Sequence, residues 1–561
     1  MADTPLLARR PAGSATGLPG PAAGAPPGRF LARAALVTAA LTAAGAFLGL
    51  LRDQLLAHSF GAGGETDAFL VAWTVPEFAA TLLIEDAMAL ILVPAFSAAL
   101  ARRTPAGDPV RALVRATLPR MAVAAALAAG LLALAAPWLV PALAPGLPRQ
   151  RLAVDCTRLA ATCVLSFALA GYCSAALRAH GRFLAPAAVY VAYNTGIISA
   201  VVLLGPGWGV RAAAAGVAAG GVLMVLVQAP SLWRRLRRPG GGTAAGAAGA
   251  RPALLIGLLA PVIVFAVSRQ SQVLVERFLA APLPAGAISH LNYAQKVAQL
   301  PMVLSLMLCT VSFPAVARAL AAGDTAAARH RAGRDLLLAA VVVLAGAAVV
   351  VAAAPRLVEL LFQRGAFDRA DTAATAAVMR VYALGLLGQT LVGALVRCYF
   401  AASRPLWYPA AAMTCGVAVT ALAGSLWAGR WGAPGIAAAN ALGITLTAGL
   451  LLAGVRGQSV PLRVGEVAAG LARLTAAATA ATAAATAAGL LCAAGPPLLA
   501  VLAVLAAVAV VFPATACALR APVVPSLLRS LFRSAVRRRA HAPAETAPVG
   551  GDVPLDRRPR G

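Results

Sequence analysis

The chain has 561 residues, of which 61% are hydrophobic and only 12% are charged, and its mean hydropathy is +0.83. No water-soluble protein of this length needs so much apolar surface, so the composition excludes a soluble globular protein and places most of the chain in lipid. The formal net charge of +28 at first suggests nucleic-acid binding, but the basic residues are distributed among the loops between apolar stretches, as in membrane proteins.

Fourteen apolar stretches are long enough to cross a bilayer. They lie near 31–51, 66–100, 119–143, 152–177, 183–205, 208–231, 253–281, 288–320, 335–361, 372–400, 405–428, 433–455, 465–492 and 496–518. Their apolar character is continuous rather than alternating, so it predicts helices and not the strands of a membrane barrel. We therefore expect an all-α polytopic membrane protein with 14 transmembrane helices.

Two short sequences recur at an offset of about 220 residues. Pro94-Ala-Phe-Ser-Ala-Ala-Leu-Ala101 is matched by Pro314-Ala-Val-Ala-Arg-Ala-Leu-Ala321, and Arg182-Phe-Leu-Ala-Pro186 by Arg404-Pro-Leu-Trp-Tyr-Pro409. Two matches in the same order favour a duplicated bundle, the architecture of a transporter with a central cavity between two pseudo-symmetric lobes.

The duplication predicts the domain boundaries. They are a disordered N-terminus (1–30), a six-helix N-lobe (31–231), a basic flexible linker (232–252), a six-helix C-lobe (253–455), two further helices (465–518) and a disordered basic tail (519–561). The first 30 residues lack the short apolar region and cleavage site of a signal peptide. The eight cysteines show no paired extracellular pattern, so we expect no disulfides.

The arginines orient the chain. With the N-terminus inside, the cytoplasmic loops hold about 20 arginines and the opposite loops about eight. This bias supports an even number of spans and two cytoplasmic termini. The Arg537-Arg538-Arg539 run in the tail favours a tether to membrane lipids over a nucleic-acid contact, so we expect no nucleic-acid partner.

Ionisable residues at bilayer depth mark the candidate functional site, because each costs a few kcal/mol unless it meets a partner or a wet cavity. In the first half these residues are Arg52, Asp53, Glu65, Asp67, Glu77, Glu85 and Asp86. Arg52, Asp53 and Glu65 can equally lie in a solvated loop. Glu77, Glu85 and Asp86 lie within an apolar run, and Pro76 is expected to break that helix, so we interpret these three as cavity-lining residues.

The second half repeats the pattern with Arg269, Glu276, Arg277 and Lys296. Arg269 and Glu276 are seven residues apart and so share a helical face. Lys296 is the only lysine of the chain. It is either a chance residue whose side chain reaches the membrane surface or a compact cation that meets a phosphate or carboxylate inside the cavity.

The sequence offers no enzyme constellation. The five histidines lack metal-ligand spacing, and neither a GxxxxGK phosphate loop nor a soluble nucleotide-binding domain is present. This leaves a transporter driven by an ion gradient, or a membrane scaffold that recruits partners through its tails.

Several segments resemble the MurJ/MviN lipid II flippase family, part of the multidrug/oligosaccharidyl-lipid/polysaccharide exporter superfamily. They are Gly49-Leu-Leu-Arg52-Asp53, Phe60-Gly-Ala-Gly63, Thr66-Asp67-Ala-Phe69, Pro76, Glu85-Asp-Ala87, Val93-Pro94, Tyr293-Ala294 through Pro301, Thr310 with Pro314, Leu361-Phe-Gln-Arg364-Gly365-Ala-Phe367-Asp368 and Tyr399-Phe-Ala401. The similarity runs in order from about residue 31 to 518.

The resemblance implies a monomeric flippase of the bacterial cytoplasmic membrane, not an enzyme. It implies two six-helix lobes plus two C-terminal helices and alternating access for lipid II, the undecaprenyl-pyrophosphate-linked cell-wall precursor. By position it implies substrate-contacting roles for Arg52, Asp53, Asp67, Glu85 and Lys296, and an ion-coupling role for Glu276 with Na⁺ or H⁺. Arg364, Gly365 and Phe367 belong to the most specific structural motif.

The chain departs from the family pattern at several cavity positions. Gly45-Ala46 replaces a Ser-Arg pair, Ala80 replaces an arginine, and Gln295 replaces an acid. For a sodium site, the segment near 405–428 offers only Met413, Thr414 and Thr420. The loss of two guanidinium groups removes two bidentate phosphate partners. An exporter of another lipid-linked glycan, or of a small amphipathic compound, is therefore the alternative reading.

Overall fold

The computed structural model describes residues 28–81, 84, 88–101, 109–236, 252–400, 406–458, 462–527, 529 and 533. Over these ranges the chain forms 18 α-helices and no strand, which confirms the all-helical prediction. Residues 1–27, most of the expected linker and the tail beyond 533 lie outside the described residues, as does Glu85.

The first half of the chain forms nine helices. They are α1 (Gly28–Phe60), α2 (Gly64–Ala80), α3 (Met88–Ala101), α4 (Pro109–Leu143), α5 (Gln150–Ala161), α6 (Cys163–Ala179), α7 (Leu184–Ala187), α8 (Val189–Trp208) and α9 (Arg211–Leu236). Helix α9 packs against α8 and α6. The α8–α9 contact depends on glycine, since a Cβ on Gly196 would lie 2.5 Å from the Cα of Gly220. Such close backbone approach is the usual way in which membrane helices associate.

The second half forms α10 (Pro252–Ala280), α11 (Ala287–Ala298), α12 (Leu300–Ala321), α13 (Thr325–Phe362), α14 (Arg369–Ala383), α15 (Leu386–Phe400) and α16 (Tyr408–Gln458). Helix α16 turns sharply at Gly432, where φ is +60°. A Cβ on Gly416 would lie 2.7 Å from the carbonyl oxygen of Gly443, so the two arms of α16 lie side by side. The predicted stretches 405–428 and 433–455 correspond to these two arms.

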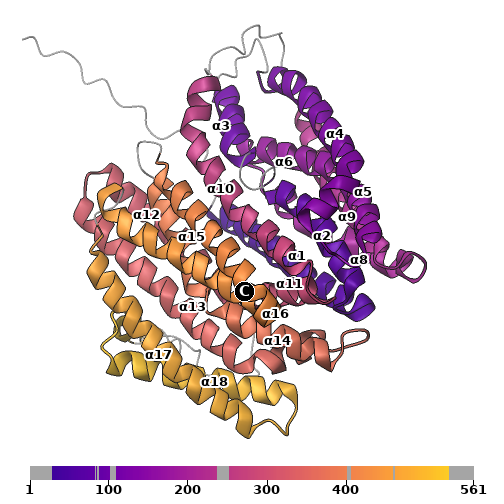
Figure 1. The fold of residues 1–561 in the computed structure, drawn as a ribbon. Helices are drawn as coiled ribbons and strands as arrows, with labels where there is room; N and C mark the ends of the chain where they lie inside the picture. Colours follow the sequence, from indigo (N-terminus) through magenta and orange to yellow (C-terminus); the bar gives the residue numbers. More distant parts are fainter. Residues whose placement is uncertain are drawn as a thin grey trace, which may run out of the picture.

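Two final helices, α17 (Val464–Leu491) and α18 (Pro497–Ala518), pack against each other and against α13. Figure 1 shows them at the edge of the molecule, beyond α13 and far from α1–α9. Helices α1–α9 pack mainly among themselves, as do α10–α16. Contacts between the two groups run from α1, α2 and α4 to α10, α11 and α13.

Nine helices in the described ranges are long and apolar enough to cross a membrane, or ten if α14 and α15, bent by 46°, form one span. This shows a polytopic membrane fold but not the predicted number of 14. The two arms of α16 count once in this test, and the predicted stretches 66–100 and 288–320 are divided into shorter helices.

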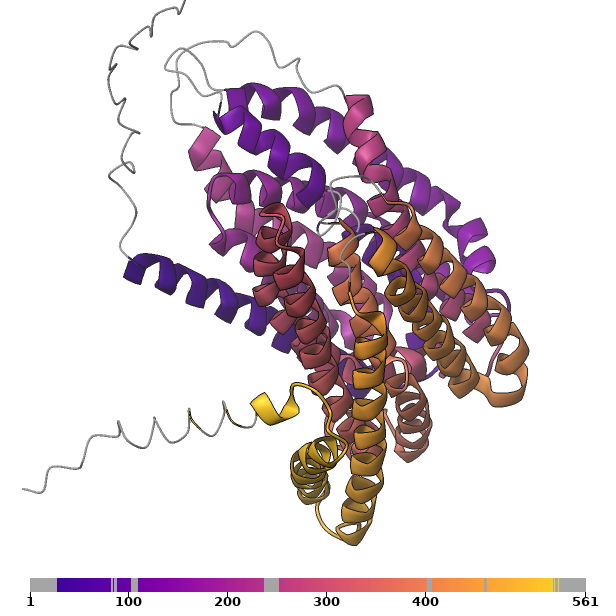
Figure 2. The ribbon, with the colours of Figure 1, turned by 90° about the vertical axis from the view of Figure 1, so that its left-hand side faces the viewer.

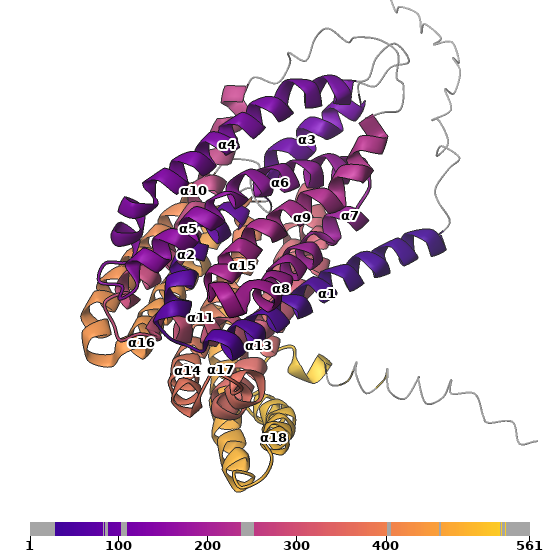
Figure 3. The same ribbon diagram turned by 90° about the vertical axis from the view of Figure 1, so that its right-hand side faces the viewer.

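Several boundaries differ from the sequence prediction. Helix α1 begins at Gly28 and continues to Phe60, well past residue 51, and its first half projects from the bundle (Figures 2 and 3). Helix α9 extends into the expected linker, to Leu236. Pro76 does not break its helix: α2 continues to Ala80. Residues 519–527, expected to be disordered, form a turn that packs beside α17.

Candidate functional site

A polar cavity of about 220 Å³ lies where α2 of the first half faces α10, α11 and α12 of the second. Helices α14, α15 and α16 complete its wall. Its charged and polar lining comprises Thr74, Glu77, Thr81, Arg269, Gln270, Gln272, Glu276, Arg277, Asn292, Gln295, Lys296, Gln299, Tyr382, Gln389 and Asn440. Three cationic side chains face two carboxylates, so the lining is rich in charge and slightly positive.

Lys296 meets a carboxylate across this cavity. Its Nζ lies 3.1 Å from Oε1 of Glu77, and the two side chains are 31% and 38% exposed. The ammonium also lies 5.5 Å from the centre of the Trp73 ring. Of the two alternatives for the single lysine, the structure shows the second, a cation that meets a carboxylate inside the cavity, while its contact with substrate stays a prediction; the cavity-lining position of Glu77 is confirmed. The pair joins the two halves of the chain.

Helix α10 presents one polar face to the cavity. Arg269, Gln272 and Glu276 follow one another at intervals of three and four residues, so they share that face. Glu276 is buried and accepts hydrogen bonds from the hydroxyl of Tyr382, at 3.5 Å, and from the side-chain amide of Asn440. The carbonyl oxygen of Asn440 in turn accepts one from Gln272 at 2.9 Å.

Arg277, offset from that face, is buried toward the first half of the chain. Its guanidinium donates to the hydroxyl of Thr74 at 3.4 Å and to the carbonyl oxygen of Ile288 at 3.2 Å. Arg277 therefore holds α2 and α11 beside α10, at the same level as the Glu77–Lys296 pair.

The side chains expected to assist Glu276 do not reach it. The Thr414 hydroxyl pairs with Ser268 at 3.1 Å, Thr420 donates to the carbonyl oxygen of Gly416, and Met413 is buried. None of the three lines the cavity. The amide beside Glu276 comes from Asn440, on the second arm of α16. Over the described ranges no three His, Cys, Asp or Glu side chains are grouped to hold a metal ion.

Arg52 and Asp53 lie outside the lining of this cavity, and their contact with substrate stays a prediction. The Arg52 guanidinium donates to the Asp53 carboxylate at 2.7 Å and to the Asn194 side chain at 2.9 Å. It also lies 4.4 Å from the ring centre of Trp73. Arg52 is thus partnered within the first half, and both it and Lys296 lie beside the Trp73 ring.

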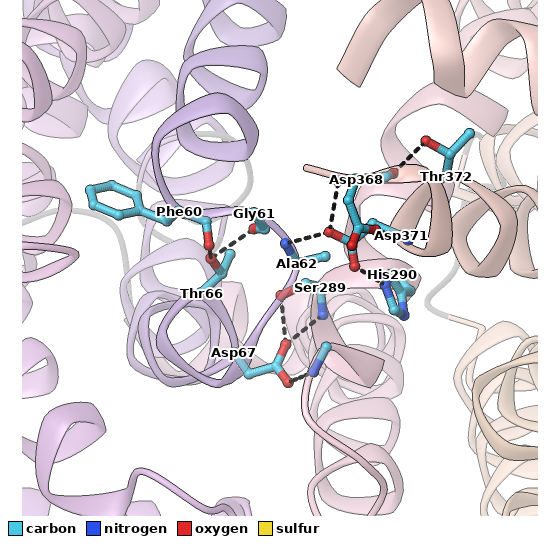
Figure 4. Close-up of polar contacts among 11 residues, drawn as sticks. Phe60, Gly61, Ala62, Thr66, Asp67, Ser289, His290, Asp368, Asp371 and Thr372 are labelled. Atoms are coloured by element: carbon cyan, nitrogen blue, oxygen red, sulfur yellow. Dashed lines mark hydrogen bonds and ion pairs between the residues drawn. The ribbon is translucent and has the colours of Figure 1, made fainter. Parts of the chain in front are cut away.

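Asp67 also lies outside the cavity, because it caps a helix of the other half (Figure 4). Its carboxylate accepts hydrogen bonds from the backbone amides of Gly286, at 2.6 Å, and Ser289, at 2.8 Å, and from the Ser289 hydroxyl at 2.5 Å. These amides belong to the first turn of α11, whose unpaired N–H groups favour an anionic acceptor. Asp67 thus makes a contact between the lobes, and its contact with substrate stays a prediction.

A second contact lies beside the first (Figure 4). The Asp371 carboxylate accepts from the Ala62 backbone amide at 3.4 Å and pairs with the His290 ring at 3.3 Å. Nearby, the Ala366 amide donates to the carbonyl oxygen of His58 at 2.9 Å. We call the contacts made by residues 58–67 with 285–290 and 364–371 the interlobe latch.

The predicted structural motif supplies part of this latch. Gly365 has φ of +63°, and a Cβ there would collide with the backbone and ring of His58. Phe367 is buried and packs 5.8 Å, centre to centre, from the ring of Tyr293. The side chain of Arg364 turns back to its own helix, to the carbonyl oxygen of Leu360. Glycine at 365 therefore allows the two halves to touch.

Five further residues line the cavity but were not predicted from the sequence: Gln272, Asn292, Tyr382, Gln389 and Asn440. All five are uncharged, so a search for ionisable groups passed over them. The signal for Gln272 was its place between Arg269 and Glu276 on one helical face. Asn440 could have been found because its side-chain amide lies inside an apolar stretch. A buried amide, like a buried charge, needs a hydrogen-bond partner.

The sequence model of the family described as lipid II flippase MurJ matches residues 56–504. A lipid II flippase MurJ of Burkholderia cenocepacia is 28% identical over 451 residues, which cover 77% of this chain and 84% of that protein. The fold is similar to a solved structure of lipid II flippase MurJ in an inward closed conformation, with a TM-score of 0.70, 16% identity, and coverage of 88% of this chain and 100% of the other. An inward-facing multidrug MATE transporter of the MOP superfamily gives a TM-score of 0.60 at 15% identity, with coverage of 77% and 99%.

Proposed function

Because the chain belongs to the lipid II flippase MurJ family, we propose that it moves lipid II from the inner to the outer leaflet of the bacterial cytoplasmic membrane. The observation that carries the proposal is the charged cavity between the two halves, with Lys296 at its wall. A pyrophosphate-linked head group cannot cross hydrocarbon unaided, because burying its charges without partners is prohibitive. A polar cavity replaces the missing solvent, while the polyprenyl tail stays in the bilayer.

The Glu77–Lys296 pair suits a site that must release and rebind an anion. Both side chains are about one-third exposed, and ion pairs of this kind contribute only about 0–1 kcal/mol. A pyrophosphate can therefore take the ammonium from Glu77 at little cost. Arg269 and Arg277 add positive charge to the same wall. A cargo bearing two phosphates fits this balance better than a cationic compound.

The interlobe latch supports alternating access. It joins the end of α1 and the start of α2 to the start of α11 and the end of α13. With 14 spans and both termini in the cytoplasm, as the arginine bias predicts, this end of the molecule faces outward. The latch then closes the cavity to the outside while cargo enters from the cytoplasmic leaflet, and its opening releases the cargo outward.

We propose that the coupling ion, Na⁺ or H⁺, acts by neutralising Glu276. The Glu276 carboxylate and the Tyr382 phenol offer oxygen ligands at this position, and a hard monovalent cation or a proton suits oxygen donors. Because α10, α14 and α16 meet at Glu276, a change in its charge alters how these helices pack.

Glu276→Gln is expected to remove the response of transport to an ion gradient, because glutamine keeps the shape of glutamate but cannot change its charge. Flipping of labelled lipid II in proteoliposomes, with a Na⁺ gradient and a pH gradient imposed separately, identifies the ion. Glu359→Gln, which disrupts a surface pair with Arg356, is the matched control and should respond as wild type does. A Glu276→Gln protein that still accelerates under the same gradient contradicts the role.

Rescue of a bacterium depleted of its own flippase tests the cargo. We expect this chain to restore growth and the purified protein to move lipid II between leaflets. The absence of arginine at Ala46 and Ala80 favours one competing outcome, transport of a different polyprenyl-linked glycan. Movement of that glycan without movement of lipid II would establish the alternative cargo. Binding of neither lipid would reject the transporter function.

A further inference from the structure

A second pocket, of about 560 Å³, lies far from the central cavity, between α13, α17 and the turn that follows α18. Helix α13 contributes Arg329, His330 and Arg334 to its wall, and the start of α17 contributes Arg463 and Glu466. Three guanidinium groups thus face one carboxylate. The base is apolar, since Leu337, Leu462 and Val467 are all buried there.

Two of these arginines are available to a ligand. Arg463 already holds Glu466 at 2.9 Å. Within the described part of the chain, no hydrogen bond or ion pair engages the guanidinium of Arg329 or of Arg334. They are five residues apart on α13 and both line the pocket. Two unpaired guanidinium groups above an apolar base make an amphipathic anion site.

The pocket lies at a membrane surface. The membrane-crossing helices α13 and α17 begin beside it, at Thr325 and Val464, and α18 ends beside it at Ala518. Three spans therefore have their ends at this level, which is the level of lipid head groups. Figure 1 places α17 and α18 at the outer edge of the fold, away from α1–α9.

The backbone around the pocket is shaped to keep it open. Val523, in the turn after α18, has φ of +76°, which a β-branched residue rarely adopts, and it lines the pocket. The Arg473 guanidinium holds this turn through the carbonyl oxygen of Arg520, at 3.2 Å. On α13, Gly333 leaves space: a Cβ there would be 3.7 Å from Val467, so only a larger side chain would fill the pocket.

We propose that this pocket binds the phosphodiester head group of an anionic membrane phospholipid, with Arg329 and Arg334 as the phosphate donors. Charge complementarity and the apolar base favour a lipid over a soluble anion. The Arg537-Arg538-Arg539 run of the same chain is itself cationic, so it cannot supply the anion. The bound lipid would link α17 and the turn after α18 to α13, independently of the cargo in the central cavity.

Lipid binding to the purified full-length protein tests the proposal, with native mass spectrometry after exchange into detergent with either phosphatidylglycerol or phosphatidylcholine. We expect retention of phosphatidylglycerol only. Loss of two charge-assisted phosphate contacts in Arg329→Ala/Arg334→Ala should weaken its binding at least about tenfold. Gly333→Leu keeps every charge and fills the pocket, so it should weaken binding equally. Arg111→Ala/Arg115→Ala on α4 removes the same charge elsewhere and should bind as wild type does.

Three results would overturn the assignment. The first is binding of phosphatidylglycerol as strong as that of the wild type in each pocket variant that folds, Gly333→Leu or Arg329→Ala/Arg334→Ala. The second is displacement of the lipid by millimolar inorganic phosphate, which would identify a soluble anion as the occupant. The third is a wild-type protein that retains lipid II but not phosphatidylglycerol, together with pocket variants that no longer retain lipid II. That result would make the pocket a cargo site.

Discussion

Lys296→Ala is expected to abolish rescue of a flippase-depleted bacterium while leaving membrane insertion intact. The substitution removes the ammonium that faces Glu77 and leaves that carboxylate unpaired in the cavity wall. Glu77 then repels a pyrophosphate at the point where Lys296 formerly attracted one, and the lining keeps two cations against two carboxylates. A hydrogen bond between charged groups is worth about 1.5–3 kcal/mol, so loss of a single phosphate contact lowers transport by about tenfold to a hundredfold. Growth rescue and flipping of labelled lipid II measure the effect.

A double variant separates two roles that Lys296 can have. If the lysine only neutralises Glu77, then Lys296→Ala/Glu77→Gln removes both charges and should recover transport. If the lysine binds cargo, as we expect, the double variant remains inactive and Lys296→Arg recovers part of the activity. Arg149→Ala, which disrupts an exposed pair with Glu65, is the matched control and should rescue fully. Full rescue by Lys296→Ala would contradict its role.

The rule that an ionisable residue at bilayer depth marks a cavity correctly places Lys296 and Glu77 but not Arg52. One physical reason explains both outcomes. An ion at bilayer depth needs either a wet cavity or a protein partner, and sequence alone does not say which. For Arg52 the partner is Asn194, 142 positions away in the chain, together with the adjacent Asp53. Only the packing of α1 on α8 brings that amide within reach.

The partners of the residues in the interlobe latch could not be predicted from the sequence either. The family resemblance marked Asp67 and Gly365 as important, but it could not give their partners. Asp67 is 219 residues from Gly286, and two of the three donors to its carboxylate are backbone amides, which every sequence contains. The continuous apolar character of the spans, by contrast, correctly predicted helices and the division of α16 near Gly432, because lipid imposes that pattern locally.

Covalent closure of the interlobe latch is expected to abolish transport reversibly. A Cβ on Gly64 would lie 3.7 Å from the Cβ of Ala285, within the range that a disulfide requires. In Gly64→Cys/Ala285→Cys, oxidation should therefore join the start of α2 to the loop before α11. If the latch must open in every transport cycle, the oxidised protein cannot flip lipid II, and a reductant restores flipping. The two single-cysteine variants, oxidised in the same way, should remain active and control for the native cysteines.

The same pair of cysteines measures how strongly Asp67 keeps the latch closed. Asp67→Asn removes the negative charge that accepts the Gly286 and Ser289 donors, so the closed state loses about 1.5–3 kcal/mol and its ratio to the open state falls about tenfold or more. Disulfide formation in the triple variant, whose rate follows the fraction of protein in the closed state, should therefore slow. Glu65→Gln, two residues away and paired only with exposed Arg149, should leave the rate unchanged. Equal rates in both backgrounds would mean that Asp67 does not set the closed state, and sustained flipping by the oxidised double-cysteine protein would mean that this end of the cavity need not open. Either result would separate transport from movement at the latch. If Asp67→Asn slows both disulfide formation and lipid II flipping, and Glu65→Gln slows neither, then the capped helix α11 takes part in the step that exposes the cavity outward.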